Sequence, residues 1–208
     1  MNEVWTIVLQ ERQALIDDLE SIKPAQWNTQ SLCEEWSVHD LLAHLVDDAK
    51  TSRKNFIFGL VRSGFNMDRL SRIGVKKEKR ASPSETLNAY KAVKERTTSA
   101  PAPLASRLVE IIVHGEDIRR PLNIPHEYPM PAIIAGIEYQ LATSDVVGGS
   151  KGRAAGLHLV ASDTDWSHGS GALVRGEAIE ILMALTGRPV PYDALTGDGA
   201  CVLRARRY

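Results

Sequence analysis

The chain has 208 residues, of which 43% are hydrophobic and 25% are charged, and its formal net charge is -1. This length allows one large domain or two small ones with a buried core, and this composition excludes an intrinsically disordered chain. A charge so close to zero provides no overall positive field, so we expect no nucleic-acid partner. Cys33 and Cys201 are too few for a disulfide framework or a metal knuckle, which predicts a reducing compartment.

The N-terminal residues lack the features of a secretory signal. Glu3 stands where a signal peptide needs basic residues, and no apolar run approaches membrane-spanning length. We therefore expect a cytoplasmic protein without a membrane partner.

Helical periodicity dominates the first two thirds of the chain. Ser37 with Asp40 and Ser82 with Glu85 have the spacing of capping boxes, and Pro121 is expected to end the fourth helix. The basic segment 62–82 is weakly periodic, which suggests a mobile or partly helical crossover. The expected helices span residues 3–20, 38 to about 60, 83–100, 103–120 and 133–147.

The pattern changes after residue 148. The glycine-rich stretch 148–156 is typical of a linker, and it is followed by an expected strand over 157–162. A short helix over 176–188 and a last strand over 200–206 complete a small α/β unit. We expect two domains, a helical bundle over 1–148 and an α/β domain over 155–208, and the fold class is mainly α.

The fourth expected helix, "RLVEIIVHGEDIRRPL", carries a polar stripe inside an apolar sequence. At about 100° per residue, Glu110, His114 and Asp117 lie on one face of this helix, with apolar residues on both sides. A buried carboxylate needs a proton, a cation or a metal, and residues four apart on a helix can bind one ion. The alternative is a local hydrogen-bonded Glu–His pair, with Asp117 pairing Arg120.

A third metal ligand has to come from another helix, as in other helix-bundle metal sites. His39 and His44 both lie in "WSVHDLLAHL", at the border of the apolar face of the second expected helix. The helical wheel does not choose between them.

"WSVHDLLAHL" followed by "EIIVHGEDIRRPL" resembles the mycothiol-dependent maleylpyruvate isomerase family, whose N-terminal domain is a DinB-like four-helix bundle. "GLHLVASDTDW" and "GEAIEILMALTGRP" are similar to the small C-terminal α/β domain of that family. The resemblance covers nearly the whole chain. It implies a divalent metal, usually zinc, held by His44, Glu110 and His114.

The resemblance also implies a function. Mycothiol would serve as thiol cosubstrate, and the metal would activate it for cis-trans isomerisation of a maleylpyruvate-like substrate or for S-transfer to a small electrophile. No catalytic residue is assigned, and the protein needs no catalytic cysteine of its own. A metal-dependent hydrolase and a non-catalytic metal-binding DinB-like module stay open as alternatives, as do a monomer and a homodimer.

Four further residues are secondary candidates. Asp40 and Asp117 lie within a turn of a candidate histidine and can orient its imidazole; the alternatives are helix capping and a salt bridge. Arg204 and Arg206 would share one face of the last expected strand and clamp an anionic substrate, unless the "LRARRY" cluster, which includes Arg207, is solvated surface.

Overall fold

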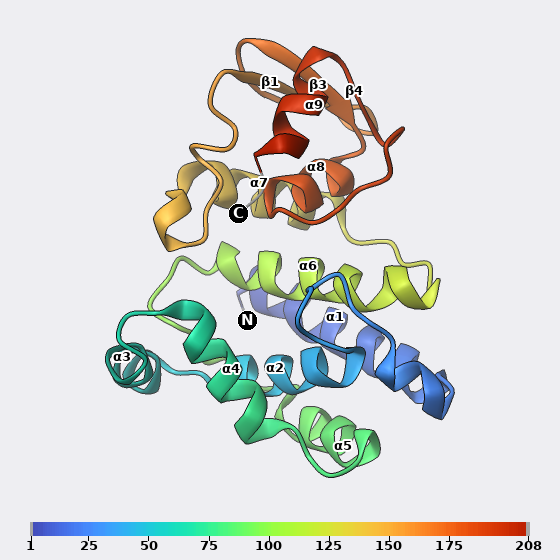
Figure 1. The fold of residues 1–208 in the computed structure, drawn as a ribbon, viewed down its shortest axis with the longest axis vertical. Coiled ribbons are helices and arrows are strands. Elements are labelled where there is room, and N and C mark those ends of the chain that lie inside the picture. Colours follow the sequence, from blue (N-terminus) through green and yellow to red (C-terminus); the bar gives the residue numbers. More distant parts are fainter. Residues whose placement is uncertain (1, 207–208) are drawn as a thin grey trace. The chain divides into compact units, whose positions relative to one another are not determined.

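The computed structural model of the protein describes residues 2–206, which form two compact units (Figure 1). The first unit contains the chain through Arg107 together with His114–His126. The second contains Leu108–Val113 and the residues from Glu127 onward. None of the helices between residues 2 and 206 has the length and apolar character that crossing a bilayer requires.

The first unit is entirely helical apart from its loops. Its helix α6 shares residues with the second unit. The elements are α1 (Glu3–Ser21), the 3-10 helix η1 (Pro24–Asn28), α2 (Val38–Lys50), α3 (Arg53–Arg62), α4 (Met67–Glu78), α5 (Pro83–Val93) and α6 (Ala105–Leu122).

The core of the first unit forms around α2. This helix begins at the expected capping box, in which Asp40 N–H donates to the Ser37 hydroxyl and Ser37 N–H donates to the Asp40 carboxylate. Leu41 and Leu42 are fully buried on α2, beside α4 and α5. Apolar residues of α1, α5 and α6 complete the same cluster.

Two expected helices of this unit are shorter than predicted. The second ends at Lys50, because Ser52 begins a new helix, α3, with its own capping box to Asn55. The third ends at Val93. The crossover 62–82 is partly helical as expected, because Asn66 caps α4 by accepting from Arg69 N–H.

The fourth helix was predicted to end at Pro121 and extends one residue further. Pro121 lies inside the last turn of α6, which continues to Leu122 and ends where Asn123 adopts a left-handed conformation with φ of 56°. Proline has no N–H, so the intrahelical hydrogen bond to the carbonyl of Asp117 is lost in this last turn. Leu32 N–H donates to that carbonyl at 3.1 Å.

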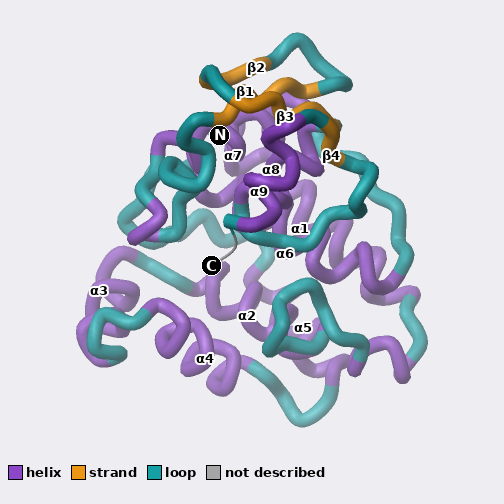
Figure 2. Tube along the Cα trace, turned by 45° about the horizontal axis from the view of Figure 1, so that its top comes forward, coloured by secondary structure: helices purple, strands orange, loops and turns teal. Residues whose placement is uncertain are grey.

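The second unit contains a small mixed sheet and helices (Figure 2). The strand order is β2-β1-β3-β4, with β1 parallel to β3 and the two outer pairs antiparallel. The elements are α7 (Met130–Ala142), the 3-10 helix η2 (Asp145–Val147), β1 (Leu157–Ala161), β2 (Ser167–Gly169), β3 (Ala172–Gly176), α8 (Ala178–Leu185), β4 (Leu195–Thr196) and α9 (Asp198–Ala205).

The last expected strand was wrong, because residues 198–205 form helix α9. Ala200 and Leu203, three residues apart, are the buried positions of this helix, which packs against β3. A helix buries positions three apart on one face, whereas a strand would place them on opposite faces. The short strands β2 and β3 were not predicted, and the fifth helix ends at Ala142.

The segment 148–156 is attached to its neighbours and does not behave as an open linker. Ser150 is fully buried, and its hydroxyl donates to the carbonyl of Leu185 in α8 at 2.6 Å. Arg153 donates to the same carbonyl at 2.6 Å. Helix α7 packs on α8, and the second unit includes the residues from Glu127 onward in addition to Leu108–Val113; the predicted domain boundary lies at 148–155.

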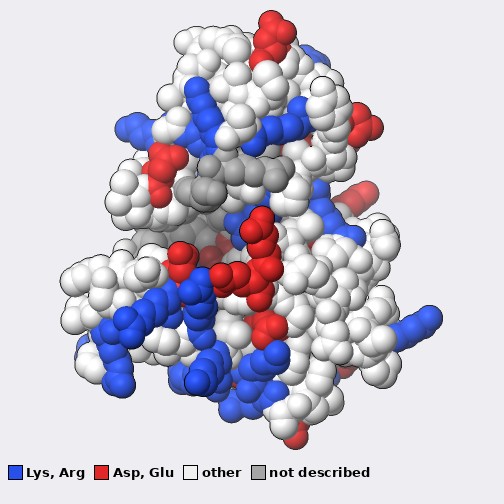
Figure 3. All heavy atoms as spheres, in the orientation of Figure 1, with Lys and Arg blue, Asp and Glu red and all other residues white. Residues whose placement is uncertain are grey.

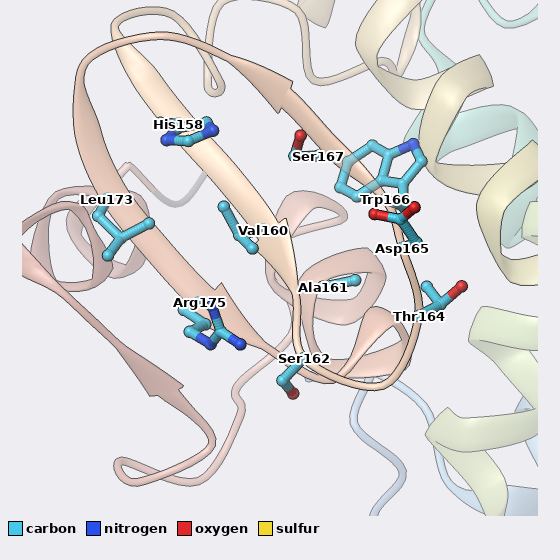
Figure 4. Close-up of a pocket in the computed structure, with 10 residues that line it drawn as sticks. All are labelled: His158, Val160, Ala161, Ser162, Thr164, Asp165, Trp166, Ser167, Leu173 and Arg175. Carbon is cyan, nitrogen blue, oxygen red and sulfur yellow. The ribbon is translucent and has the colours of Figure 1, made fainter.

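One face of the sheet carries a surface hollow of about 620 Å³ (Figure 4). His158 and Val160 of β1 alternate with the buried Leu157, Leu159 and Ala161, so the hollow lies on the less buried face of the strand. Arg175 lines it from β3, and Trp166 lines it near β2. Trp166 donates its indole N–H to Glu138 at 2.7 Å, which fixes the ring.

Several basic residues of α4 and its flanks are paired with acidic residues of the first unit. Figure 3 shows Lys and Arg side chains gathered beside Asp and Glu in the lower part of the view. Arg72 donates to Glu35 at 2.6 Å and Lys79 to Asp40 at 2.7 Å. We therefore find a mixed charged surface over α4 instead of an unbroken basic patch.

The mainly helical fold with a small C-terminal sheet confirms the expected fold class.

Candidate metal centre

Helix α2 supplies the first histidine of the candidate site. His44 lies between the buried residues Ala43 and Leu45 of α2, and its side chain is partly exposed. Its imidazole lies against the indole of Trp36, with ring centroids 4.9 Å apart. The helix is anchored by Leu41 and Leu42, so the position of His44 is set by packing.

Helix α6 supplies Glu110 and His114, one turn apart on the same face. Ile111, Ile112 and Val113, which separate them in sequence, are buried. Glu110 is partly exposed, whereas His114 is 9% exposed. The polar stripe predicted for this helix therefore exists in the structure.

The three side chains come together. Candidate ligand atoms of His44, Glu110 and His114 all lie within 4.8 Å of one another. The two imidazoles meet edge to face, with ring centroids 5.0 Å apart and an interplanar angle of 83°. Ligand atoms of a tetrahedral zinc ion are about 3.3 Å apart, so small side-chain movements would complete such a site. Two imidazoles and one carboxylate are a donor set that suits zinc and leaves a position open.

Asp117 lies beside Nδ1 of the His114 ring. Its Oδ2 lies 2.8 Å from Nδ1 of His114, and its side chain is fully buried. An ionised carboxylate can only accept, so the proton of a neutral His114 belongs on Nδ1 and Nε2 is left for a metal. Arg120, the alternative partner predicted for Asp117, donates to Glu116 at 2.6 Å.

Asp40 has the contacts of a helix cap. Its carboxylate accepts from Ser37 and from Lys79 Nζ at 2.7 Å. Burial raises the pKa of the Asp40 carboxyl, but the hydrogen bonds from Lys79 and Ser37 outweigh that effect and hold the pKa below its usual value. Asp40 was expected either to orient a histidine or to cap the helix, and these contacts correspond to helix capping.

His39 is directed to another part of the first unit. Its Nε2 lies 2.8 Å from the hydroxyl of Thr86 in α5, and its ring meets Trp27 edge to face. Burial lowers the pKa of His39, as does the charge of Lys79, while Asp40 opposes them. His44, and not His39, is thus the α2 histidine beside Glu110 and His114.

A pH-dependent loss of stability is expected from His39. Because its pKa is lower in the folded state than the unfolded value of 6.5, the unfolded chain binds more protons as the pH falls below that value. The free energy of unfolding should then decrease with falling pH, by at most about 1.4 kcal/mol per pH unit from this group. Urea unfolding of the wild type and His39→Gln between pH 5 and 8 measures this pH dependence. Equal pH slopes in the two proteins would contradict the assignment.

Arg204 and Arg206 bind backbone carbonyls of the second unit. Arg204 donates to the carbonyl of Leu195 at 2.9 Å, and Arg206 donates to those of Arg153 and Ala155 at 2.7 Å each. The prediction that Arg204 and Arg206 share one face assumed a strand. This segment is the helix α9, so that reason for pairing them does not apply. Their substrate role stays a prediction, and Arg207 lies outside the described residues.

Cys33 was not predicted as a neighbour of the site. Its Sγ donates to Asp117 Oδ2 at 3.2 Å and lies 4.0 Å from Nδ1 of His114. Cys33, His114 and Asp117 form a second group whose candidate ligand atoms lie within 4.8 Å of one another. Trp36, which contacts His44, was missed as well.

Comparison with known proteins places the chain in a family. The sequence model of the mycothiol maleylpyruvate isomerase N-terminal domain matches residues 8–119, which is more than half of the chain and includes His44, Glu110 and His114. The chain belongs to this family. A comparison with curated protein sequences finds no match.

Two solved structures resemble the whole chain of this mycothiol maleylpyruvate isomerase family member. One is a mycothiol-dependent maleylpyruvate isomerase, with 16% sequence identity and a TM-score of 0.61. The other is a histidine-to-alanine mutant of a mycothiol-dependent maleylpyruvate isomerase, with 15% identity and the same TM-score. Each match covers 95% of this chain and 92% of the other chain. At this identity the likeness shows a shared fold over both units.

Proposed function

We propose that the chain is a metal- and mycothiol-dependent enzyme that activates a thiol for cis-trans isomerisation of a maleylpyruvate-like substrate or for S-transfer to a small electrophile. The observation that carries the proposal is the meeting of His44, Glu110 and His114 from two helices. Membership of the family supports mycothiol as the thiol cosubstrate.

The residues of the site have separate tasks in this proposal. His44 and His114 offer neutral nitrogen ligands, and Glu110 offers the negative charge that a divalent cation needs. Asp117 keeps the proton of His114 on Nδ1. When bound there, a divalent ion such as zinc would lower the pKa of an incoming thiol and favour its thiolate form.

The chemistry after thiol activation belongs to the cosubstrate and the substrate. Addition of the mycothiol sulfur to a conjugated double bond leaves a single bond that can rotate, and elimination of the same sulfur returns the trans isomer. An S-transferase stops at the adduct. Both reactions begin with the same nucleophile, so this set of ligands is suited to either. We propose a cytoplasmic monomer or homodimer.

Metal content and mycothiol binding test the proposal together. Purified wild type should contain about one zinc per chain and bind mycothiol by calorimetry, because three protein ligands leave a coordination position open. His114→Ala should lose both properties. The matched control is His168→Ala, which alters an exposed histidine of β2.

Three results would count against the proposal. The first is wild type without zinc after supplementation. The second is turnover of a hydrolysable substrate without added thiol, which indicates a hydrolase. The third is metal-dependent melting without thiol binding, which indicates a non-catalytic module.

A further inference from the structure

The segment Gln30–Ser37, between η1 and α2, is built as a rigid loop. Ser31 N–H and the Ser31 hydroxyl both donate to the carbonyl of Trp36, at 3.0 and 2.6 Å. The Gln30 amide donates to the carbonyls of Cys33 and Trp36, at 2.8 and 2.9 Å. These internal hydrogen bonds restrain the backbone from which the Cys33 and Trp36 side chains project.

Pro121 leaves open the backbone acceptor on α6 to which this loop donates a hydrogen bond. In an uninterrupted helix the N–H of residue 121 would donate to the carbonyl of Asp117. Proline has no N–H, so that acceptor is available, and Leu32 N–H donates to it at 3.1 Å. The residue after Leu32 is Cys33. The loop is therefore anchored beside the carboxylate of Asp117.

Cys33 and His114 share one oxygen of that carboxylate. Oδ2 of Asp117 lies 3.2 Å from Cys33 Sγ and 2.8 Å from His114 Nδ1. Asp117 is 0% exposed, so its carboxylate is held by protein groups and not by bulk water. Two donors on one oxygen restrict rotation of the carboxylate about its Cβ–Cγ bond.

We propose that Cys33 is a positioning residue of the metal site, whose S–H holds Asp117 against His114 Nδ1 and thereby keeps His114 Nε2 directed toward the ligand position. This inference rests on the proposed function for its consequence, but the contacts among Cys33, Asp117 and His114 exist without a metal. From the same loop, Trp36 packs against the other histidine, His44.

The distances favour a hydrogen-bonded array over a second metal site at Cys33. Separations of 2.8 and 3.2 Å are those of hydrogen bonds, and ligand atoms of tetrahedral zinc would be about 3.3 Å or more apart. A metal at this position would also have to displace the proton from His114 Nδ1. Direct binding of a metal by Cys33 would therefore contradict the inference.

The test compares Cys33→Ala with Cys33→Ser, both in a Cys201→Ala background that removes the other thiol. Cys33→Ala should weaken zinc binding about tenfold, as the loss of an outer partner of a metal ligand does, in competition with a chromophoric chelator. Cys33→Ser keeps a donor and should stay within about threefold of the background protein. Cobalt substitution should give a changed visible spectrum for Cys33→Ala alone.

Nitrogen NMR of His114 in the metal-free proteins separates this inference from the proposed function. The background protein should show the Nδ1-protonated tautomer, and Cys33→Ala should show a mixture. If no form binds zinc, the proposed function fails, and the tautomer still decides the role of Cys33. Should Cys33→Ala not fold, Cys33→Val replaces it as the variant without a polar donor.

Two outcomes would overturn the inference. One is a Cys33→Ala protein with unchanged zinc affinity, cobalt spectrum and His114 tautomer. The other is a thiolate-to-cobalt charge-transfer band in the background protein that disappears in Cys33→Ala, because Cys33 would then be a ligand.

Discussion

Glu110→Gln is expected to lower zinc affinity by at least about a hundredfold, since loss of an outer partner alone costs up to that much. The substitution keeps the size of the side chain and removes the only carboxylate in the His44, Glu110, His114 set. An amide oxygen is a far weaker ligand for zinc than a carboxylate. Chelator competition measures the affinity, and thiol-dependent turnover at fixed zinc should fall in parallel.

The matched control for this prediction is Glu95→Gln. Glu95 lies in the first unit with 73% of its side chain exposed, and its nearest cation is Lys94 at 3.7 Å. The same chemical change there should leave zinc affinity and turnover unchanged. A Glu110→Gln protein that keeps full thiol-dependent turnover would show that Glu110 is a structural partner of His114.

Local signals in the sequence predicted where many helices begin. Ser37 with Asp40 and Ser82 with Glu85 are capping boxes in the structure, because this motif satisfies backbone groups within four residues. The break at Ser52 uses the same motif, with asparagine as the reciprocal residue. The strand predicted over residues 200–206 was wrong, because packing against β3 decides the conformation of such a short apolar segment.

The candidate site was predictable only in part. Periodicity placed Glu110 and His114 on one face, but the choice between His39 and His44 depends on α5, where Thr86 contacts His39. Cys33 lies on a loop, so no periodicity points to it. One signal was available in the sequence, since a proline in the last turn of α6 leaves the carbonyl of Asp117 open to another segment.

The second large effect is expected at the ion pair between α1 and α6. Arg119 is almost completely buried and donates to Asp18 Oδ2 at 2.7 Å, while the side chain of Asp18 is 25% exposed. The two partners therefore differ in their exposure to solvent. Removing the carboxylate takes an ionic partner away from a buried cation, whereas removing the cation leaves a carboxylate that water can reach.

Asp18→Ala should thus lower the free energy of unfolding by about 3 kcal/mol, near the lower limit for breaking a buried pair because Asp18 is partly exposed. Arg119→Met, which fills similar space without a charge, should cost less than Asp18→Ala. The double variant should recover most of the stability lost in Asp18→Ala, because no buried cation remains. Urea unfolding of all four proteins gives these differences and the coupling energy. If Arg119→Met costs as much as Asp18→Ala, the stabilisation comes from the ion pair itself.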